Sequence, residues 1–393
     1  MKKFLSVLLA LAMIFVLAAC GSDDAGAADA GFRVAMISDY SGITDQSFNQ
    51  TTWEACLEFE KNTGNVVKYY KPVTNDTAGR VASAELAIAE GYNVIVMPGY
   101  AFAGSVVELS ANYPNVKFVA LDISKGDLLE GGVALKGEAY DYNPDNWNLT
   151  DYVYMDNVYC AIYQEELAGY MAGFAAVKLG YTKLGFLGGM AVPAVARYGY
   201  GFVQGVDAAA KELGIDAEVK YVYGGQFFGD ADITAVMDTW YSNGTEVVFA
   251  CGGSIWSSAA ESAKKYGGKV IGVDTDQAAI IDDLYGAGIT VTSAMKGLAP
   301  TTIDTLTDIV VNGKWTDYAG KIQTLGLVSE DPAANYVGIP ATSTQFAEGK
   351  FTSEDYAALV KAMLEGTLQV SNDTSTMPAT TNTTVLDQGN IKG

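Results

Sequence analysis

The sequence predicts an α/β protein built from two series of alternating strands and helices, and three observations support this class. The chain has 393 residues, more than one ordinary core holds, so two domains of roughly 100–200 residues each are expected. Short apolar runs rich in β-branched residues alternate with segments of helical periodicity. Within the runs, as in residues 33–39 (RVAMISD), consecutive positions are apolar, which is typical of parallel strands buried on both faces.

The first series precedes residue 139. Its expected strands are residues 33–39, 66–73, 94–97 and 116–122, and its expected helices are residues 48–61, 78–91 and 104–113. Gly91 follows directly on a periodic segment, and glycine at that place commonly ends a helix. Residues 139–151 (AYDYNPDNWNLTD) then interrupt the alternation with polar and turn-forming residues.

A helical pattern returns at residues 161–179 and opens the second series. Its expected strands are residues 183–188, 219–223, 247–250, 269–274 and 290–295, and its expected helices are residues 194–213, 230–242, 257–266 and 301–311. Residues 371–384 (SNDTSTMPATTNTT) are rich in Ser, Thr and Asn. This stretch is therefore expected to be poorly ordered, within a polar C-terminal tail over residues 371–393.

Composition excludes several classes of function. The chain contains no histidine, which excludes Ser-His-Asp and Cys-His hydrolases and any histidine-ligated metal site. Its net charge of −22 argues against nucleic acid as a partner, because phosphate backbones require clusters of Lys and Arg. No metal and no cofactor is expected.

The first residues have the pattern of a secretory signal. Lys2 and Lys3 precede an apolar run over residues 4–19, broken only by Ser6, which is too short for a reliable membrane-spanning helix. Residues 17–21 (LAACG) resemble the lipobox of bacterial lipoproteins, which implies cleavage after residue 19 and acylation of Cys20. The alternative is an ordinary secreted protein with an incidental cysteine. The expected location is extracytoplasmic, anchored to the cell membrane by lipid.

Residues 20–31 contain no large apolar residue and are expected to form a flexible tether. The three cysteines beyond it are Cys56, Cys160 and Cys251. Their wide spacing and odd number indicate neither a disulfide framework nor a thiolate metal site, and buried thiols are expected instead.

Polar residues gather where expected strands end. Ligands of open parallel sheets bind outside the carboxyl ends of the strands. The residues at those ends are Asp39, Asp122, Gly252, Gly253, Ser254, Asp274 and Asp276. Each aspartate could instead cap the following helix, but their recurrence in both halves predicts a shared cleft.

Several motifs together resemble the basic membrane protein family of ABC-transporter solute-binding lipoproteins, which includes a purine nucleoside receptor. The motifs are SD at residues 38–39, TDQSFNQ at 44–50, WE at 53–54, QEELAGYMAG at 164–173, LGFLGGM at 184–190 with Pro193, GF at 201–202, IGVDTDQ at 271–277, TS at 292–293 and Lys296. The combination is specific, although each motif alone would be weak, and it extends over about residues 33–328.

The resemblance implies a two-lobed periplasmic-binding-protein fold of type I, with three crossover segments and a ligand cleft between the lobes. The first lobe would take residues 31–158 and 297–325. The second would take residues 159–296 and 326–370.

The resemblance also implies how a nucleoside would be bound. It places Phe48 as a ring that stacks on the base, with Ser47 and Asn49 beside it. The alternative for Phe48 is a hydrophobic contact at the helix start. Stacking of a base on an aromatic ring contributes roughly 1–3 kcal/mol.

Carboxylates are expected around the polar parts of the nucleoside. By the resemblance, Asp122 would bind the edge of the base and Asp39 would lie near the base or ribose. Asp274 and Lys296 match the pair that the family uses on the ribose hydroxyls, and a structural salt bridge is their alternative. Gly253, with the glycine before it, would let backbone amides approach the sugar, or would only form a turn.

The second stacking ring has three candidates. Phe228 is favoured by the QFFGD segment at residues 226–230, Phe227 is next, and Trp256 stands where the family usually has a small residue. Tyr40 also replaces a commonly smaller or polar residue. These departures leave the preferred base open.

The expected function is therefore a non-catalytic, monomeric receptor that closes around a purine nucleoside and delivers it to the permease and ATPase of an importer. A sugar or autoinducer receptor of the same fold is one alternative. A secreted nucleoside hydrolase or glycosidase with paired carboxylates is another.

Overall fold

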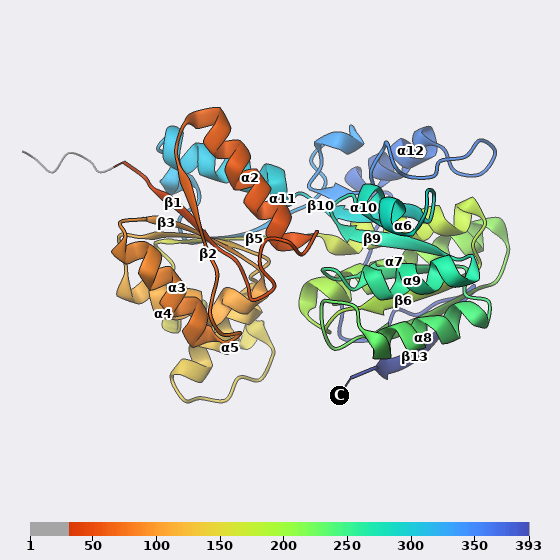
Figure 1. Ribbon diagram of the computed structural model, residues 1–393, viewed down its shortest axis with the longest axis horizontal. Coiled ribbons are helices and arrows are strands. Elements are labelled where there is room, and N and C mark those ends of the chain that lie inside the picture. The colour runs from red at the N-terminus through yellow and green to blue at the C-terminus, as the bar shows by residue number, and fades with distance from the viewer. Residues whose placement is uncertain (1–30, 393) are drawn as a thin grey trace, which may run out of the picture. The chain divides into compact units, whose positions relative to one another are not determined.

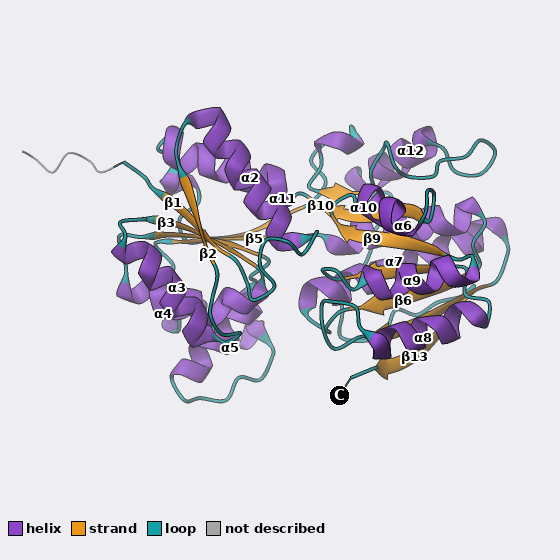
Figure 2. Cartoon of the chain, in the orientation of Figure 1, coloured by secondary structure: helices purple, strands orange, loops and turns teal. Residues whose placement is uncertain are grey.

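The computed structural model describes residues 31–392, which form two sheets of almost wholly parallel strands with helices packed on both (Figure 1 and Figure 2). The α/β class predicted from the sequence is confirmed. The expected signal peptide, Cys20 and residues 20–30 of the tether lie outside the described residues. Within the described part of the chain, no helix is long and apolar enough to cross a membrane.

The first sheet has six parallel strands in the order β11-β5-β4-β3-β1-β2. Its strands are β1 (Val34–Ile37), β2 (Val67–Tyr70), β3 (Val94–Pro98), β4 (Lys117–Leu121), β5 (Val158–Tyr163) and β11 (Lys321–Leu325). Its helices are α2 (Phe48–Thr63), α3 (Thr77–Ala89), α4 (Ala103–Asn112), α5 (Lys125–Leu135) and α11 (Leu298–Leu306). In Figure 1, α2 and α11 cover one face of the sheet and α3 to α5 cover the other. Coverage of both faces explains why the inner strands are apolar at nearly every position.

The second sheet has the order β12-β10-β9-β8-β6-β7-β13, and only the β10–β12 pair is antiparallel. Its strands are β6 (Lys183–Gly188), β7 (Ala217–Tyr223), β8 (Val247–Cys251), β9 (Lys269–Asp274), β10 (Thr290–Lys296), β12 (Val337–Gly338) and β13 (Thr383–Asn390). Its helices are α6 (Glu165–Leu179), α7 (Pro193–Leu213), α8 (Ala231–Ser242), α9 (Trp256–Tyr266), α10 (Ala278–Tyr285) and α12 (Ser353–Leu364).

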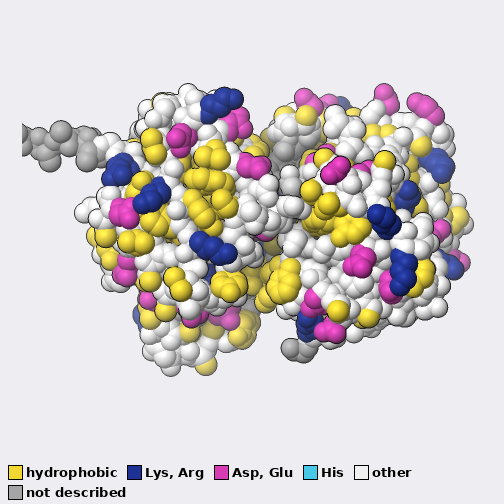
Figure 3. Space-filling model, viewed as in Figure 1, with side chains coloured by type: hydrophobic (Ala, Val, Ile, Leu, Met, Phe, Trp, Pro, Cys, Tyr) yellow, Lys and Arg dark blue, Asp and Glu magenta, His cyan; other side chains and the backbone are white. Residues whose placement is uncertain are grey.

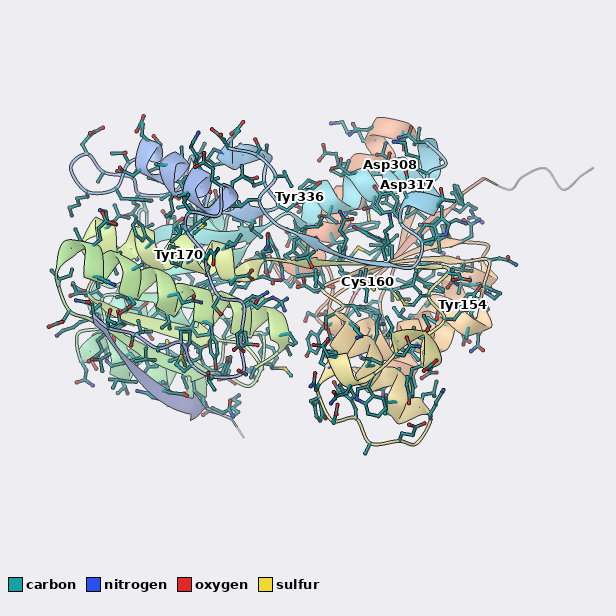
Figure 4. The ribbon with its side chains drawn as sticks, turned by 180° about the vertical axis from the view of Figure 1, so that it is seen from behind. Tyr154, Cys160, Tyr170, Asp308, Asp317 and Tyr336 are labelled. Carbon is teal, nitrogen blue, oxygen red and sulfur yellow. The ribbon has the colours of Figure 1, made fainter. Side chains whose placement is uncertain are left out.

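Three segments carry the chain from one sheet to the other. They are Gln164 between β5 and α6, Gly297 between β10 and α11, and residues 326–336 between β11 and β12. Tyr336, labelled in Figure 4, belongs to the third of them. We use "first lobe" and "second lobe" for the two sheets with their helices.

The expected boundary between residues 158 and 159 falls inside β5 and is wrong. All of β5 belongs to the first sheet, where Tyr159 to Tyr163 pair with β11, so the first crossing comes at Gln164. The helix expected over residues 161–179 likewise starts later, at Glu165. The apolar end of β5 leads almost directly into an apolar helix, and periodicity alone does not separate the two.

The expectation of poor order over residues 371–384 is wrong for the end of that stretch. Residues 383–390 form β13, which pairs in parallel with β7. Before it, the backbone amides of Thr381 and Asn382 donate to the Asp207 carboxylate at 2.9 and 2.7 Å. Polar composition did not prevent order here, because the backbone of β7 and the carboxylate of Asp207 supply hydrogen-bond partners for this segment.

Cys56, Cys160 and Cys251 are buried free thiols, as expected. Figure 4 labels Cys160 on β5. Burial raises the pKa of each of the three thiols above its usual value.

Candidate functional site

A cavity of about 660 Å³ lies at the carboxyl ends of the strands of both sheets. Residues after β1 and β4 line it from the first lobe, and the ends of β8, β9 and β10 line it from the second. In Figure 3, hydrophobic side chains lie on both sides of the groove between the two lobes. This is the place where open parallel sheets bind ligands.

The structure brings eight of the nine expected binding residues to this cavity. They are Asp39, Phe48, Asn49, Asp122, Phe228, Gly253, Asp274 and Lys296. The ninth, Ser47, is fully buried and does not line the cavity, but its hydroxyl donates to Oδ2 of Asp274 at 2.6 Å.

Lys296 is at the centre of a buried cluster of charges. Its ammonium pairs directly with Oδ2 of Asp122 and lies 3.4 Å from Oδ1 of Asp274. Oε1 of Glu165 is 3.6 Å away. Lys296 is the last residue of β10 in the second sheet and Asp122 follows β4 in the first, so the pair joins the two lobes.

Burial and opposite charges act against each other in this cluster. Burial by itself lowers the pKa of the Lys296 ammonium, but the surrounding carboxylates outweigh it and hold that pKa above its usual value. Burial raises the pKa of Asp122 to about 6, although Lys296 works in the opposite direction. The ammonium is therefore charged at neutral pH, and the pKa of Asp122 lies closer to neutral pH than that of an ordinary aspartate.

A second cation, Arg197, completes the cluster and was not anticipated from the sequence. Its Nε donates to Oε2 of Glu165 at 2.6 Å, and Arg197 lines the cavity. Glu165 starts α6 and Arg197 lies in the first part of α7. A Cβ on Gly201 would overlap the backbone of Glu166, so the two helices touch here only because residue 201 is glycine.

Asp122 and Asp274 share an unusual backbone conformation. Their φ angles are +56° and +65°, in the left-handed region that most L-residues avoid. Both directly terminate strands, β4 and β9 respectively, so the turn aims each carboxylate into the space beyond its sheet. Such strain is concentrated at functional sites because the surrounding structure must enforce it.

The start of α2 is built around Asp45. The Asp45 carboxylate accepts from the backbone amides of Ser47, Asn49 and Gln50 at 3.2, 2.9 and 2.9 Å. It also accepts from the Asn49 side chain at 2.8 Å, while Oδ1 of Asn49 accepts from the Asp39 amide at 2.9 Å. These bonds fix Phe48, the first residue of the helix, at the cavity wall.

Aromatic rings reach the cavity from both lobes. The Lys296 ammonium lies 4.7 Å from the centre of the Phe48 ring. From the second lobe come Phe227 and Phe228, and the Phe227 ring is 6.4 Å from the ring of Tyr100 in the first lobe. Tyr100 and Tyr198 also line the cavity and were missed, because only the fold brings them there.

Trp256 does not reach the cavity. It is 3% exposed, belongs to the apolar core of the second lobe and packs edge-on against Tyr285 at 6.1 Å. Of the three candidates for the second stacking ring, the structure leaves Phe227 and Phe228.

Gly253 contributes to the site through Phe227. Gly253 has φ +52°, and a Cβ there would lie 2.5 Å from the carbonyl oxygen of Phe227. At the neighbouring Gly252 a Cβ would lie 2.6 Å from the Phe227 ring. Because neither glycine has a side chain, the pair leaves space for Phe227, independently of any contact that the two glycine amides would make with a sugar.

The remaining strand-end aspartate, Asp276, is exposed and accepts from the amide of Ala278 at 3.1 Å. This bond is a turn formed just before α10, whose N-cap residue is Gln277, so Asp276 is not the helix cap; nor is it among the cavity-lining residues.

Comparison with known proteins defines the class of this fold and site. The fold is similar to a solute-binding protein of an ABC transporter system from Aeropyrum pernix, at 20% identity, 87% coverage of this chain, 88% of the other and a TM-score of 0.61. It is similar to a second one from Conexibacter woesei, at 20% identity, 87% and 99% coverage and a TM-score of 0.60. The fold is thus that of the solute-binding proteins of ABC transporters.

Residues 32–349 match the family described as PnrA-like ABC transporter substrate-binding proteins (Bmp), and the chain belongs to this family. It is 28% identical to the ABC transporter nucleoside-binding protein BmpA of Lactococcus lactis over 68% of this chain and 72% of that protein. It is also 24% identical to basic membrane protein B of Borreliella burgdorferi, over 62% of this chain and 65% of that protein. An uncharacterized lipoprotein of Pyrococcus abyssi is 22% identical over 81% and 73%. The family resemblance expected from the sequence is confirmed.

Proposed function

We propose that this substrate-binding protein binds a purine nucleoside between its two lobes and passes it to the permease of an ABC importer. The observation that carries the proposal is the composition of one cavity. It combines aromatic rings from both lobes with a buried lysine surrounded by carboxylates. This combination is complementary to a nucleoside, which has a flat apolar base at one end and a polar ribose at the other.

The base would lie between Phe48 of the first lobe and Phe227 or Phe228 of the second. Stacking on an aromatic ring contributes roughly 1–3 kcal/mol per base and tolerates different bases. Oδ1 of Asp122 is buried and has no hydrogen-bond partner among the described residues. It is thus available as an acceptor for an N–H at the edge of the base, and Asp39 would provide a second polar contact nearby.

The ribose would lie against Asp274 and Lys296. A carboxylate accepts two hydrogen bonds from adjacent hydroxyls, and an ammonium donates to an oxygen. Ser47 holds one oxygen of Asp274, which leaves Oδ1 to face the ligand and Lys296. In this arrangement Ser47 positions Asp274 and does not itself touch the sugar. Asn49 plays a similar part by fixing the backbone of Asp39.

Ligand contacts from both lobes would favour a closed arrangement, because a ligand shifts a conformational equilibrium only through different affinities for its two states. Arg197 and Glu165 support Lys296 from the side of the second lobe. The protein's role is to bind and release, and no step of chemistry is part of the proposal.

We also propose that Cys20 is acylated and anchors the protein on the outer face of the cell membrane. The support is the LAACG sequence at residues 17–21 and the similarity to the Pyrococcus abyssi protein, which is itself called a lipoprotein. Expression with a labelled fatty acid tests this proposal. Label is expected in the wild type, and Cys20→Ser should lose both the label and membrane retention.

Isothermal titration calorimetry with the purified mature protein tests which class of ligand the protein binds. The panel is adenosine, guanosine, inosine, uridine, ribose, a hexose and adenosine monophosphate. We expect heat of binding with a purine nucleoside and little with the nucleotide, since the acidic chain disfavours an added phosphate. Binding of a sugar alone, or no response to any nucleoside, would contradict the proposal.

Two further measurements separate the alternatives. Asp274→Asn should reduce nucleoside affinity by at least tenfold at an unchanged circular dichroism spectrum. Incubation of protein and nucleoside followed by chromatography should return intact nucleoside. Release of free base would instead identify a hydrolase.

A further inference from the structure

The loop that carries Phe227 and Phe228 is held on its inner side by the chain after β8. This loop, residues 224–230, connects β7 with α8. The amide of Ser254 donates to the carbonyl of Phe227 at 2.9 Å, and Phe228 and Ser254 form a parallel β-bridge. These contacts fix one side of the loop only, and Phe228 remains 56% exposed.

Residues 391 and 392, directly after β13, hold the other side. The amide of Ile391 donates to the carbonyl of Tyr223 at 2.8 Å, and its side chain packs on the apolar core of the second lobe. The Lys392 ammonium pairs with Asp230 and donates to Oε1 of Gln226 at 3.2 Å. A Cβ at Gly225 would lie 3.0 Å from the Cβ of Lys392, so the two backbones are close.

The contacts of Lys392 lead to the backbone of Phe228. Nε2 of Gln226 donates to the carbonyl oxygen of Phe228 and to Oδ2 of Asp230, both at 2.9 Å. Asp230 also caps α8 by accepting from the Ile233 amide at 3.0 Å. Lys392, Gln226 and Asp230 thus form a network that spans the loop from its start to its end.

We propose that residues 383–392 are a strap that fixes the aromatic loop of the cavity, and that Lys392 is a positioning residue for ligand binding. The family match ends at residue 349, so the strap lies outside the part of the chain that the family model describes. The effect on affinity rests on the proposed function, because it assumes that Phe227 or Phe228 contacts the ligand. The effect on the loop does not.

The test compares Lys392→Ala with Lys361→Ala. Lys361 also forms an ion pair of the second lobe, at 3.0 Å from Glu330; this pair is more exposed than that of Lys392, and Lys361 is not among the cavity-lining residues, so it is the control. Lys392→Ala should weaken nucleoside binding about three- to tenfold, as expected for loss of a half-exposed charged hydrogen bond that orders a loop. Lys361→Ala should leave affinity within about twofold.

A second background separates positioning from general destabilisation. In Phe228→Ala the ring of Phe228 is absent, so if Lys392 acts on affinity by positioning this ring, adding Lys392→Ala should change affinity much less than it does in the wild type. Equal losses in both backgrounds would overturn the role of Lys392 in positioning that ring. Equal thermal stability of wild type and Lys392→Ala would agree with a local role.

Amide hydrogen exchange gives a readout that needs no ligand. Exchange of residues 224–230 should be faster in Lys392→Ala than in the wild type and in Lys361→Ala. Unchanged exchange overturns the strap, whatever the ligand is. Faster exchange with no binding of any nucleoside to the wild type would instead keep the strap and contradict the proposed function.

Discussion

The Ser47 hydroxyl donates a 2.6 Å hydrogen bond to Oδ2 of Asp274, 227 positions further along the chain. Ser47 precedes α2 in the first lobe and Asp274 ends β9 in the second. Both side chains are buried, and the bond lies behind the cavity wall. Nearby, Nε2 of Gln277 in the second lobe donates to the carbonyl of Gln46 at 3.1 Å. The residue that precedes Phe48 therefore fixes the carboxylate that we propose binds the ribose.

Ser47→Ala should lower both stability and ligand affinity. The change leaves a buried carboxylate oxygen without its donor, which costs about 2 kcal/mol of unfolding free energy. It also frees Asp274 to rotate, so nucleoside affinity should fall. Urea unfolding and calorimetry measure the two effects. The control is Ser110→Ala, because Ser110 is equally buried but its hydroxyl has no hydrogen-bond partner among the described residues. Equal losses in both variants would contradict the prediction.

Lys296→Met should destabilise the fold strongly at neutral pH. Removing the cation leaves Asp122, Asp274 and Glu165 together without their shared partner, and breaking a buried pair typically costs about 3–5 kcal/mol. Without Lys296 the pKa of Asp122 should rise further above its usual value. In the variant, the folded-state pKa of Asp122 would exceed the unfolded-state pKa by more than it does in the wild type. Protonation of Asp122 at low pH then offsets part of the cost, so the loss of unfolding free energy should be smaller at pH 5 than at pH 8.

Urea unfolding of Lys296→Met at both pH values gives this difference. Lys314→Met is its control, since Lys314 is half-exposed in its ion pair with Asp308. A loss from Lys296→Met no greater than that from Lys314→Met would show that the buried cluster is not strongly coupled.

Glu166→Gln should stabilise the protein above neutral pH. Burial raises the pKa of Glu166 from 4.5 to about 7, and its Oε2 has no hydrogen-bond partner among the described residues. A folded-state pKa above the unfolded one favours folding below about pH 4.5, and this contribution is lost as pH rises to 7. The neutral amide removes the dependence. The stability difference between variant and wild type should therefore grow between pH 4.5 and 7, on the order of 2–3 kcal/mol. Glu58→Gln, at an exposed position, is the control for the removal of one negative charge.

Gly253→Ala should weaken ligand binding beyond the cost of backbone strain. The new Cβ would lie 2.5 Å from the Phe227 carbonyl oxygen, so Phe227 must move. Gly267 has a similar positive φ of +78° but no atom within 4 Å of an added Cβ. Both Gly→Ala variants should lose about 1 kcal/mol of stability from strain, and only Gly253→Ala should lose affinity as well. Similar nucleoside affinities of Gly253→Ala and Gly267→Ala would show that the position of Phe227 does not affect ligand binding.

Most of the strands that position the site were predictable because they are buried on both faces. Residues 94–97 and 247–250 show this as continuous apolar runs, which β3 and β8 confirm. β13 (TTVLDQGN) was not predictable, because most of its side chains are exposed and its order comes from backbone bonds to β7. The helix α5 (KGDLLEGGVAL) carries three glycines and gives a weak helical signal.

The site divides in the same way. The positions of Asp122 and Asp274 at strand ends were predictable, since each aspartate directly follows an apolar run. Arg197 and Tyr100 could not be assigned, because their contacts with Glu165 and Phe227 depend on how α7 and the turn after β3 pack. The burial of Trp256 was likewise decided by tertiary packing against Tyr285.

The left-handed backbone at Asp122 and Asp274 restricts how this cleft can change in evolution. Asparagine, aspartate and glycine are the residues that adopt this conformation readily. Glutamate would keep the charge but lose the turn, and asparagine would keep the turn but lose the charge. Aspartate alone keeps both the negative charge and the left-handed backbone. A substitution at either position therefore changes which ligands the cleft can bind.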